Sequence, residues 1–261
     1  MIPIIILTLT GVVLAIAIGL VAKYFGVEQD PRIEKLLNML PGANCGGCGF
    51  AGCGDYAKAV VEGRAKLGLC AAMSEKGLAE AAAIVGAAAG EMRERKVAVV
   101  CCHGDETVAS TRAFYNGVTD CVNATMVANG GKSCTYGCLG LGTCARICPF
   151  NAIEITDKHI AVVHEDACKG CGKCVAVCPR NVIKLVPATA PVHVFCNSPE
   201  SFKLKKNACK AGCIGCRKCA KSCGEGQITF NGFLAVINYD NPPDEKVADV
   251  CPMHTIGKPI K

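Results

Sequence analysis

The chain contains 261 residues, among them 22 cysteines and no tryptophan, and its formal net charge is +6 at pH 7. Disulfide frameworks are typical of secreted chains of less than about a hundred residues, so composition argues against one here. The cysteines fall in interleaved CxxC spacings, and prolines follow Cys148, Cys178 and Cys251. This pattern favours metal ligation in a reducing compartment, where metal binding supplies part of the folding free energy. Without interleaved aromatics or a recognisable binding module, we expect no nucleic-acid partner.

Residues 1–27 are predicted to form a transmembrane anchor. Ile2 to Ala22 carry no charge, and about 20 apolar residues span the hydrocarbon core of a bilayer. A secretory signal would show positive charge before the apolar run and a small-residue cleavage site after it, and neither is convincing. Because Lys23 follows directly, the positive-inside tendency predicts a single-pass protein of the cell membrane with its bulk on the cytoplasmic side.

Residues 28–74 are predicted to form a small helical domain around an iron–sulfur cluster. A short helix begins near Asp30 and stops at Pro41. The glycine-rich loop that follows carries three cysteines, and a fourth lies beyond a second predicted helix at residues 55–67. Glycines let the backbone curl around a cluster and turn amide groups toward its sulfur atoms. The predicted ligands of this [4Fe–4S] cluster are Cys45, Cys48, Cys53 and Cys70.

Residues 75–96 are alanine-rich and predict a linking helix, and residues 97–190 predict a ferredoxin-like module with two clusters. In the run CKGCGKCVAVCP, three cysteines spaced two residues apart converge on one [4Fe–4S] cluster. The fourth, just before proline, ligates the neighbouring cluster in such a two-cluster module. The first cluster of this module is therefore expected on Cys148, Cys168, Cys171 and Cys174.

The second cluster of the module lacks one ligand in its motif. Cys138, Cys144 and Cys178 are expected to hold it, but Leu141 stands where the fourth cysteine belongs. Cys134 is the first candidate to complete the set, and Cys121 is the second.

The cysteines of this module repeat further along the chain. Five of them recur 75 positions later, which predicts a duplicated unit: Cys121, Cys134, Cys138, Cys144 and Cys148 correspond to Cys196, Cys209, Cys213, Cys219 and Cys223. Residues 191–261 are thus predicted to be a second ferredoxin-like module that lacks one cluster motif. Its single cluster is expected on Cys213, Cys216, Cys219 and Cys251. The predicted fold class is α+β, with an N-terminal transmembrane helix, a small helical domain and two ferredoxin-like modules.

This count assigns sixteen cysteines to about four [4Fe–4S] clusters. Six cysteines remain, and each is most simply a buried small apolar residue: Cys101, Cys102, Cys121, Cys196, Cys209 and Cys223. Four of these lie close to the modules in sequence and leave an extra cluster as an alternative: Cys102, Cys121, Cys196 and Cys209.

A basic segment in the second module is a candidate docking site for an acidic protein. Between Ser201 and Cys223 there are seven basic residues and no acidic one. Complementary charge mainly raises the rate of encounter, so an acidic carrier such as a ferredoxin fits this segment. A solvated face without a partner is the competing interpretation. The candidate docking residues are Lys203, Lys205, Lys206 and Lys210.

The order of these motifs resembles a known family. The apolar anchor, the segment DPRIEKLLNMLPGANCGGCGFAGC, the run VAVVCC, the run SCTYGCLGLGTCARICPFNAI and the CIGC module follow one another as in B subunits of Rnf-type complexes. The resemblance covers nearly the whole chain. It implies an electron-transfer subunit that accepts electrons from reduced ferredoxin and relays them to partner subunits. Those partners include membrane and flavin-containing subunits, and translocation of Na⁺ or H⁺ belongs to them.

Two other functions remain open at this point. A closely related complex reduces an iron–sulfur transcription factor, and the residues do not separate that role from energy conservation. A cluster-storage or assembly protein would require exposed, labile clusters. In each case the chain needs no catalytic acid, base or nucleophile of its own.

Overall fold

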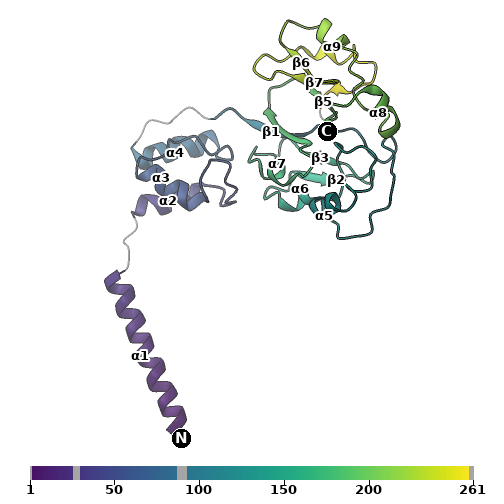
Figure 1. The fold of residues 1–261 in the computed structure, drawn as a ribbon. Coiled ribbons are helices and arrows are strands. Elements are labelled where there is room, and N and C mark those ends of the chain that lie inside the picture. The colour runs from purple at the N-terminus through teal and green to yellow at the C-terminus, as the bar shows by residue number, and fades with distance from the viewer. Residues whose placement is uncertain (1, 26–29, 87–92, 259–261) are drawn as a thin grey trace.

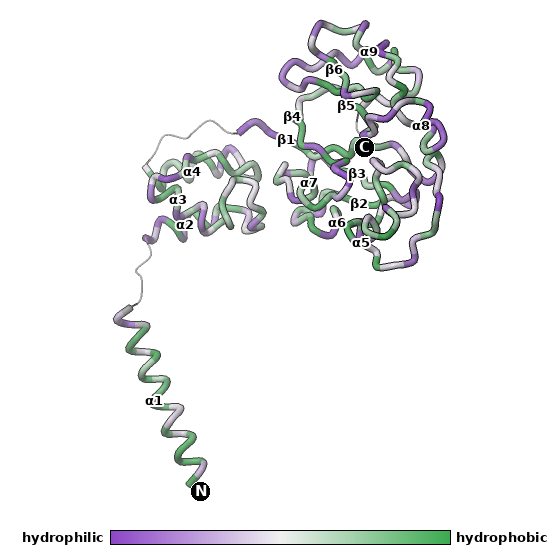
Figure 2. Tube along the Cα trace, in the orientation of Figure 1, coloured by the Kyte–Doolittle hydropathy of each residue, from purple (hydrophilic) through white to green (hydrophobic). Residues whose placement is uncertain are grey.

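The computed structural model describes residues 2–25, 30–86 and 93–258 of the chain. The first helix, α1 (Ile2–Phe25), stands apart from the rest (Figure 1), and Figure 2 shows apolar residues along most of its length. Ile2–Val21 have a mean hydropathy of 2.9 and bury nothing against the chain itself. By length and composition this helix is able to cross a membrane, since 20 residues rise about 30 Å.

Three helices form a small unit after α1 (Figure 1): α2 (Pro31–Met39), α3 (Cys53–Val61) and α4 (Glu75–Val85). Asp30 caps α2 by accepting a hydrogen bond from the Arg32 backbone N–H, and proline occupies the first helical position, where no amide donor is needed. Leu36 and Tyr56 are almost fully buried at the centre. The loop between α2 and α3 is thereby held at one end of this helical core.

Two predicted helices differ in extent from the structure. The second helix of this unit begins at Cys53 rather than residue 55 and ends at Val61, followed by Gly63 at a φ of +75°. The linking helix predicted over residues 75–96 is helical over Glu75–Val85 and ends at Gly86 in the left-handed conformation. Its Leu78 and Ala81 belong to the same core as Leu36, so α4 packs on the small unit. Residues 87–92 lie outside the described residues.

The next part of the chain builds a core from two strand pairs and short helices. Strand β1 (Lys96–Val100) pairs antiparallel with β4 (Ile183–Pro187), with Lys96 opposite Pro187. Strands β2 (Ile153–Ile155) and β3 (Ala161–Val163) form an antiparallel hairpin. Every residue of β1 after Lys96 is buried, because β3 packs beside it. The short helices are α5 (Cys121–Met126), α6 (Thr143–Ile147) and α7 (Lys173–Val177).

The last part has its own apolar core around Val192, Leu234 and Ile256. Strand β5 (His193–Val194) pairs with β8 (Ile256–Gly257), and β6 (Ile228–Asn231) pairs with β7 (Leu234–Ile237). The remaining elements are α8 (Phe202–Ala208), α9 (Lys218–Lys221) and the 3₁₀ helix η1 (Glu245–Val247).

The strand pairs connect segments that are distant in sequence. The described residues contain four separate two-stranded antiparallel sheets, in the pairs β1–β4, β2–β3, β5–β8 and β6–β7. The β1–β4 pair continues past Val100, because the Cys101 backbone N–H donates to the Val182 carbonyl at 2.7 Å. Figure 1 places α8 beside both cores, with β6 and β7 on one side and α5 and α6 on the other. Strand pairs and apolar cores therefore hold the two ends of the cysteine-bearing loops in place.

Candidate iron–sulfur sites

The four cysteines predicted for the N-terminal unit line one cavity: Cys45, Cys48, Cys53 and Cys70. Asn44 holds the loop in place, because its side-chain oxygen accepts the Cys53 backbone N–H at 2.8 Å. Gly52 is required beside it, since a Cβ there would come within 2.8 Å of that oxygen. Tyr56 of α3 closes the floor of the cavity and donates its hydroxyl to the Lys66 carbonyl at 3.1 Å.

A second cavity is lined by the four cysteines that the ferredoxin spacing assigns to one cluster: Cys148, Cys168, Cys171 and Cys174. Backbone amides point at two of the sulfur atoms: the Ala98 N–H donates to Cys168 Sγ and the Ala152 N–H to Cys148 Sγ, both at 3.4 Å. Burial, followed by the neighbouring cysteines, raises the pKa of the Cys174 thiol to about 12. A thiolate at this position would be stabilised by a bound cation, which iron would supply.

A third group contains Cys138, Cys144 and Cys178, and the structure adds Cys121 to it. Burial, then the charges of Cys138, Cys121, Cys178 and Cys174 in that order, raise the pKa of the Cys144 thiol to about 12. Cys121 is the first residue of α5, and the sequence placed it second among the candidates for this set. The first candidate, Cys134, lies elsewhere, in a cavity with Cys102, Cys196 and Cys209.

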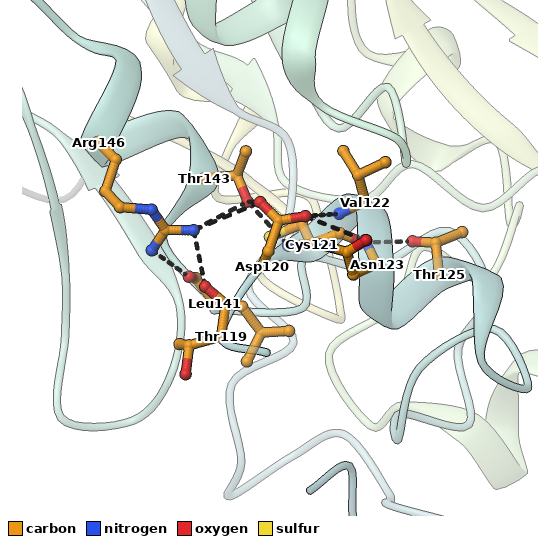
Figure 3. A network of polar contacts seen from close by, with 9 residues as sticks. All are labelled: Thr119, Asp120, Cys121, Val122, Asn123, Thr125, Leu141, Thr143 and Arg146. Carbon is orange, nitrogen blue, oxygen red and sulfur yellow. Dashed lines mark hydrogen bonds and ion pairs between the residues drawn. The ribbon is translucent and has the colours of Figure 1, made fainter. Parts of the chain in front are cut away.

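Asp120 holds Cys121 in position through the network drawn in Figure 3. Its carboxylate caps α5 by accepting the Val122 and Asn123 backbone N–H groups at 2.9 and 3.0 Å. Thr143, the residue before Cys144, donates its hydroxyl to Asp120 at 2.8 Å and accepts the Cys121 N–H at 2.8 Å. The two cysteines are thus tied together through the residue that precedes each of them. The spacing of the motif carries no signal for this link.

Arg146 completes the network from α6 (Figure 3). Its guanidinium donates to the Thr119 carbonyl at 2.7 Å and to the Leu141 carbonyl at 3.0 Å, and it lies 3.4 Å from the Asp120 carboxylate. The main chain at Leu141, where the motif lacks its cysteine, is thereby fastened to the start of α5.

The fourth predicted set, Cys213, Cys216, Cys219 and Cys251, converges in the last part of the chain. Burial raises the pKa of the Cys219 thiol to about 11, and the other three cysteines contribute through their charges. The Thr255 backbone N–H donates to Cys251 Sγ at 3.4 Å. Cys216 is exposed, whereas the other 21 cysteines, all in the described part of the chain, are partly or fully buried. Cys223 packs against the same apolar core as Cys213, Cys219 and Cys251, and its thiol lies 3.8 Å from the Ala220 carbonyl.

The cysteines that line these cavities are the donors that an iron–sulfur cluster uses. All 22 cysteines are free thiols, and the described residues contain no group of three cysteine, histidine or acidic side chains that closes on one metal ion. A lone zinc ion draws its thiolates to about 2.3 Å. Four cysteines around one cavity match the donor set of a [4Fe–4S] cluster.

The predicted docking lysines divide into two kinds. Lys203, Lys206 and Lys210 are exposed on or next to α8, as is Leu204 between them. Lys205 is 4% exposed, and its ammonium donates to the Ser198 carbonyl at 3.1 Å. A buried ammonium is not available to a docking partner, so Lys205 is removed from the candidate docking surface.

Comparisons with family models assign two segments of the chain. A model described for an Fe-S cluster matches residues 40–72, and a model for a 4Fe-4S dicluster domain matches residues 133–182. The first segment contains the cavity beside α3, and the second contains most cysteines of the β1–β4 core. The fold and these sites define an iron–sulfur protein with an Fe-S domain and a 4Fe-4S dicluster domain.

Relatives among characterised proteins are similar over most of their length. The chain is 41% identical to the B subunit of the ion-translocating oxidoreductase complex of Methanosarcina acetivorans, over 88% of this chain and 85% of the relative. It is 38% identical to the B subunit of the Na(+)-translocating ferredoxin:NAD(+) oxidoreductase complex of Acetobacterium woodii, over 100% of this chain and 78% of the relative. The B subunit of the proton-translocating ferredoxin:NAD(+) oxidoreductase complex of Clostridium ljungdahlii is 37% identical, over 90% of this chain and 82% of the relative. The chain belongs to this family, the B subunits of ion-translocating oxidoreductase complexes.

Proposed function

We propose that this chain accepts electrons from reduced ferredoxin and passes them to other subunits of an Rnf-type ion-translocating complex. The observation that carries the proposal is that two predicted sets of four cysteines line two cavities in a chain of this family. Relatives named for ferredoxin and NAD(+) support the donor and the kind of complex. The remaining subunits, membrane-embedded and flavin-containing, would carry ion movement and the final acceptor.

The cysteines would hold four [4Fe–4S] clusters, which when bound gain and lose single electrons. The sets are Cys45, Cys48, Cys53 and Cys70; Cys148, Cys168, Cys171 and Cys174; Cys121, Cys138, Cys144 and Cys178; and Cys213, Cys216, Cys219 and Cys251. Backbone N–H groups at Ala98, Ala152 and Thr255 donate to ligand sulfurs and would stabilise the reduced, more negative state.

The domain organisation follows the same assignment. Residues 1–27 would anchor the chain as a single membrane span, with Lys23 and the remainder on the cytoplasmic side. Because α4 shares the core of α2 and α3, the N-terminal cluster domain would extend from residue 28 to about Val85. Residues 97–190 would form the two-cluster ferredoxin-like module and residues 191–261 the one-cluster module.

The donor would dock at the one-cluster module. Its Cys216 is the exposed cysteine of the chain, and Arg217, Lys218 and Lys221 beside it are exposed too. Lys203, Lys206 and Lys210 on and after α8 extend the basic surface. An acidic ferredoxin would be steered to this surface, close to a ligand that reaches solvent.

Anaerobic stopped-flow mixing tests the function. The full chain, purified without oxygen in detergent, is mixed with chemically reduced ferredoxin. We expect visible bleaching of this protein's clusters as ferredoxin becomes oxidised, at a rate that falls with added salt. Iron-replete protein that leaves reduced ferredoxin unchanged over minutes would contradict the proposal. A protein that instead loses its iron quickly to a mild chelator would favour a storage role.

A further inference from the structure

We propose that Cys102, Cys134, Cys196 and Cys209 form a fifth four-cysteine site, which binds a [4Fe–4S] cluster between the two ferredoxin-like modules. These four residues line one cavity of their own. The inference rests on the proposed function only in that it treats the chain as an iron–sulfur protein.

Glycines border the thiols of this cavity. A Cβ on Gly104 would lie 3.3 Å from Cys102 Sγ and 3.4 Å from Cys209 Sγ. A Cβ on Gly137 would lie 3.5 Å from Cys134 Sγ and 3.7 Å from Cys102 Sγ. Each of these glycines therefore touches two of the thiols at once, and a side chain there would enter the space between them.

Backbone hydrogen bonds lock the four segments together despite their distance in sequence. The His103 N–H donates to the Phe195 carbonyl at 3.2 Å, which joins the residue after Cys102 to the residue before Cys196. The Ser110 N–H donates to the Ala208 carbonyl at 3.0 Å, directly before Cys209. The Ser133 N–H, directly before Cys134, donates to the Ser110 carbonyl at 2.8 Å. Tertiary contacts thus form the cavity and hold together the segments that carry its four cysteines.

The surroundings of the cavity favour a negatively charged occupant. Lys205 lines the cavity, and Lys132 is two residues before Cys134 in the chain. These lysines are only 4% and 7% exposed, and their ammonium groups donate to the Ser198 carbonyl at 3.1 Å and to the Gly104 carbonyl at 2.8 Å. Within the described residues neither has a carboxylate within ion-pair distance. A buried cation without a counter-charge is costly, and four thiolates around a cluster would supply one.

Amide donors and one carboxylate complete the lining. The backbone N–H groups of Gly104 and Cys138 donate to Cys102 Sγ at 3.3 and 3.5 Å. Such amide contacts to sulfur stabilise iron–sulfur ligation. Glu200 also lines the cavity, where its carboxylate accepts from the Ser198 hydroxyl at 3.4 Å. The surroundings of the cavity thus contain two lysine ammonium groups and two amide donors, against the single negative charge of Glu200.

The position of the site links the two modules. Cys138 belongs to the set of Cys144 and Cys178, and its own backbone amide contacts Cys102 Sγ. On the other side, a Cβ on Gly212 would lie 4.0 Å from Cys196 Sγ, and Gly212 directly precedes Cys213 of the last set. The fifth site therefore fills the interval between the one-cluster module and the two-cluster module.

Native mass spectrometry of the anaerobically purified full chain tests the site without any substitution. Five bound [4Fe–4S] clusters, about 20 iron atoms per chain, are expected. A fully loaded protein with four clusters would overturn the proposal, as would zinc or a disulfide at these cysteines. The readout is independent of ferredoxin, so a chain that binds five clusters and fails to oxidise ferredoxin would refute only the proposed function.

Two cysteine variants locate the fifth cluster. Cys209→Ser and Cys196→Ser are each expected to lower iron and sulfide content by about one fifth, while the reduced-state spectra of the other clusters persist. The matched control is Cys223→Ser, which changes a partly buried cysteine in none of the five sets and should leave the iron content unchanged. Full iron content in both site variants would overturn the assignment. If a variant fails to fold, the cluster count of the unmodified chain still tests whether the fifth site binds a cluster.

Discussion

Gly47 lies directly against Cys171. A Cβ on Gly47 would come within 2.9 Å of the Cys171 Cα and 3.2 Å of its Cβ. Cys171 also lines the cavity of Cys45 and Cys48, although it belongs to the neighbouring set. Arg93 strengthens the approach, because its guanidinium donates to the Gly47 carbonyl at 2.8 Å. The cavity of Cys45 and Cys48 and the cavity of Cys148, Cys168 and Cys174 therefore share a wall.

Gly47→Ala is expected to force these two sites apart. The added methyl group meets backbone atoms, which cannot move aside as a flexible side chain would, and overpacking of this kind costs about 1–3 kcal/mol. In the reduced protein, magnetic coupling between the two neighbouring clusters should weaken, seen as narrower lines in the electron paramagnetic resonance spectrum. Gly54→Ala in α3 is the control, since its Cβ would meet nothing within 4 Å. Unchanged coupling in Gly47→Ala would refute the shared wall.

Thr143→Val should destabilise the site that contains Cys121. The change removes the hydroxyl that donates to Asp120 and accepts the Cys121 N–H, both at 2.8 Å. Two hydrogen bonds are worth about 1–3 kcal/mol together, so we expect a lower thermal midpoint and faster loss of one cluster to a chelator. Thr229→Val, at an exposed strand position with a long 3.5 Å contact, should change the midpoint little. Equal effects of the two substitutions would argue against the role of the Asp120 network.

His193 is expected to make the folded state sensitive to acid. Its imidazole is 1% exposed and lies 3.1 Å from the Tyr239 hydroxyl, and burial lowers its pKa to about 4. An unfolded histidine has a pKa of about 6.5, so between pH 6.5 and 4 the unfolded state binds more protons. Stability should therefore fall as the pH drops through this window, by on the order of 3 kcal/mol, and the dependence should level off below it.

The thermal midpoint at pH 5 and pH 7.5, measured without oxygen, tests this prediction. His193→Gln should show a smaller drop between the two pH values than the unmodified chain, because glutamine does not titrate. His164→Gln serves as the control, since His164 is exposed. A drop of unchanged size in His193→Gln would assign the acid sensitivity to other groups.

Charge reversal should locate the docking surface for ferredoxin. Lys206→Glu with Lys210→Glu is expected to slow ferredoxin oxidation by roughly 10-fold at low ionic strength and to weaken its salt dependence, because attraction becomes repulsion. Stopped-flow rates at several salt concentrations measure both effects. Lys35→Glu with Lys76→Glu makes the same change of net charge on exposed helices of the N-terminal unit. If the N-terminal pair slows the reaction and the first pair does not, the donor docks near Cys45.

The sequence by itself determined the local parts of this protein. The apolar run of α1 and the sets Cys45 to Cys70 and Cys148 to Cys174 follow from patterns of neighbouring residues. Local spacing predicts these features because an apolar run and a CxxCxxC turn are each defined by residues close together in the sequence. It failed where a helix stopped early at a glycine, as α4 does at Gly86.

Only the tertiary structure decided which distant cysteines meet. Cys121 joins Cys144 through Asp120 and Thr143, a link between segments more than twenty positions apart. Cys134 instead joins Cys102, Cys196 and Cys209, whose segments are held together by backbone hydrogen bonds from His103 to Phe195, from Ser110 to Ala208 and from Ser133 to Ser110. Lys205, basic like its neighbours in sequence, is turned inward by the packing of α8. Contacts of this kind depend on strand pairs and apolar cores that join segments far apart in the chain. The spacing of residues in the sequence therefore does not predict them.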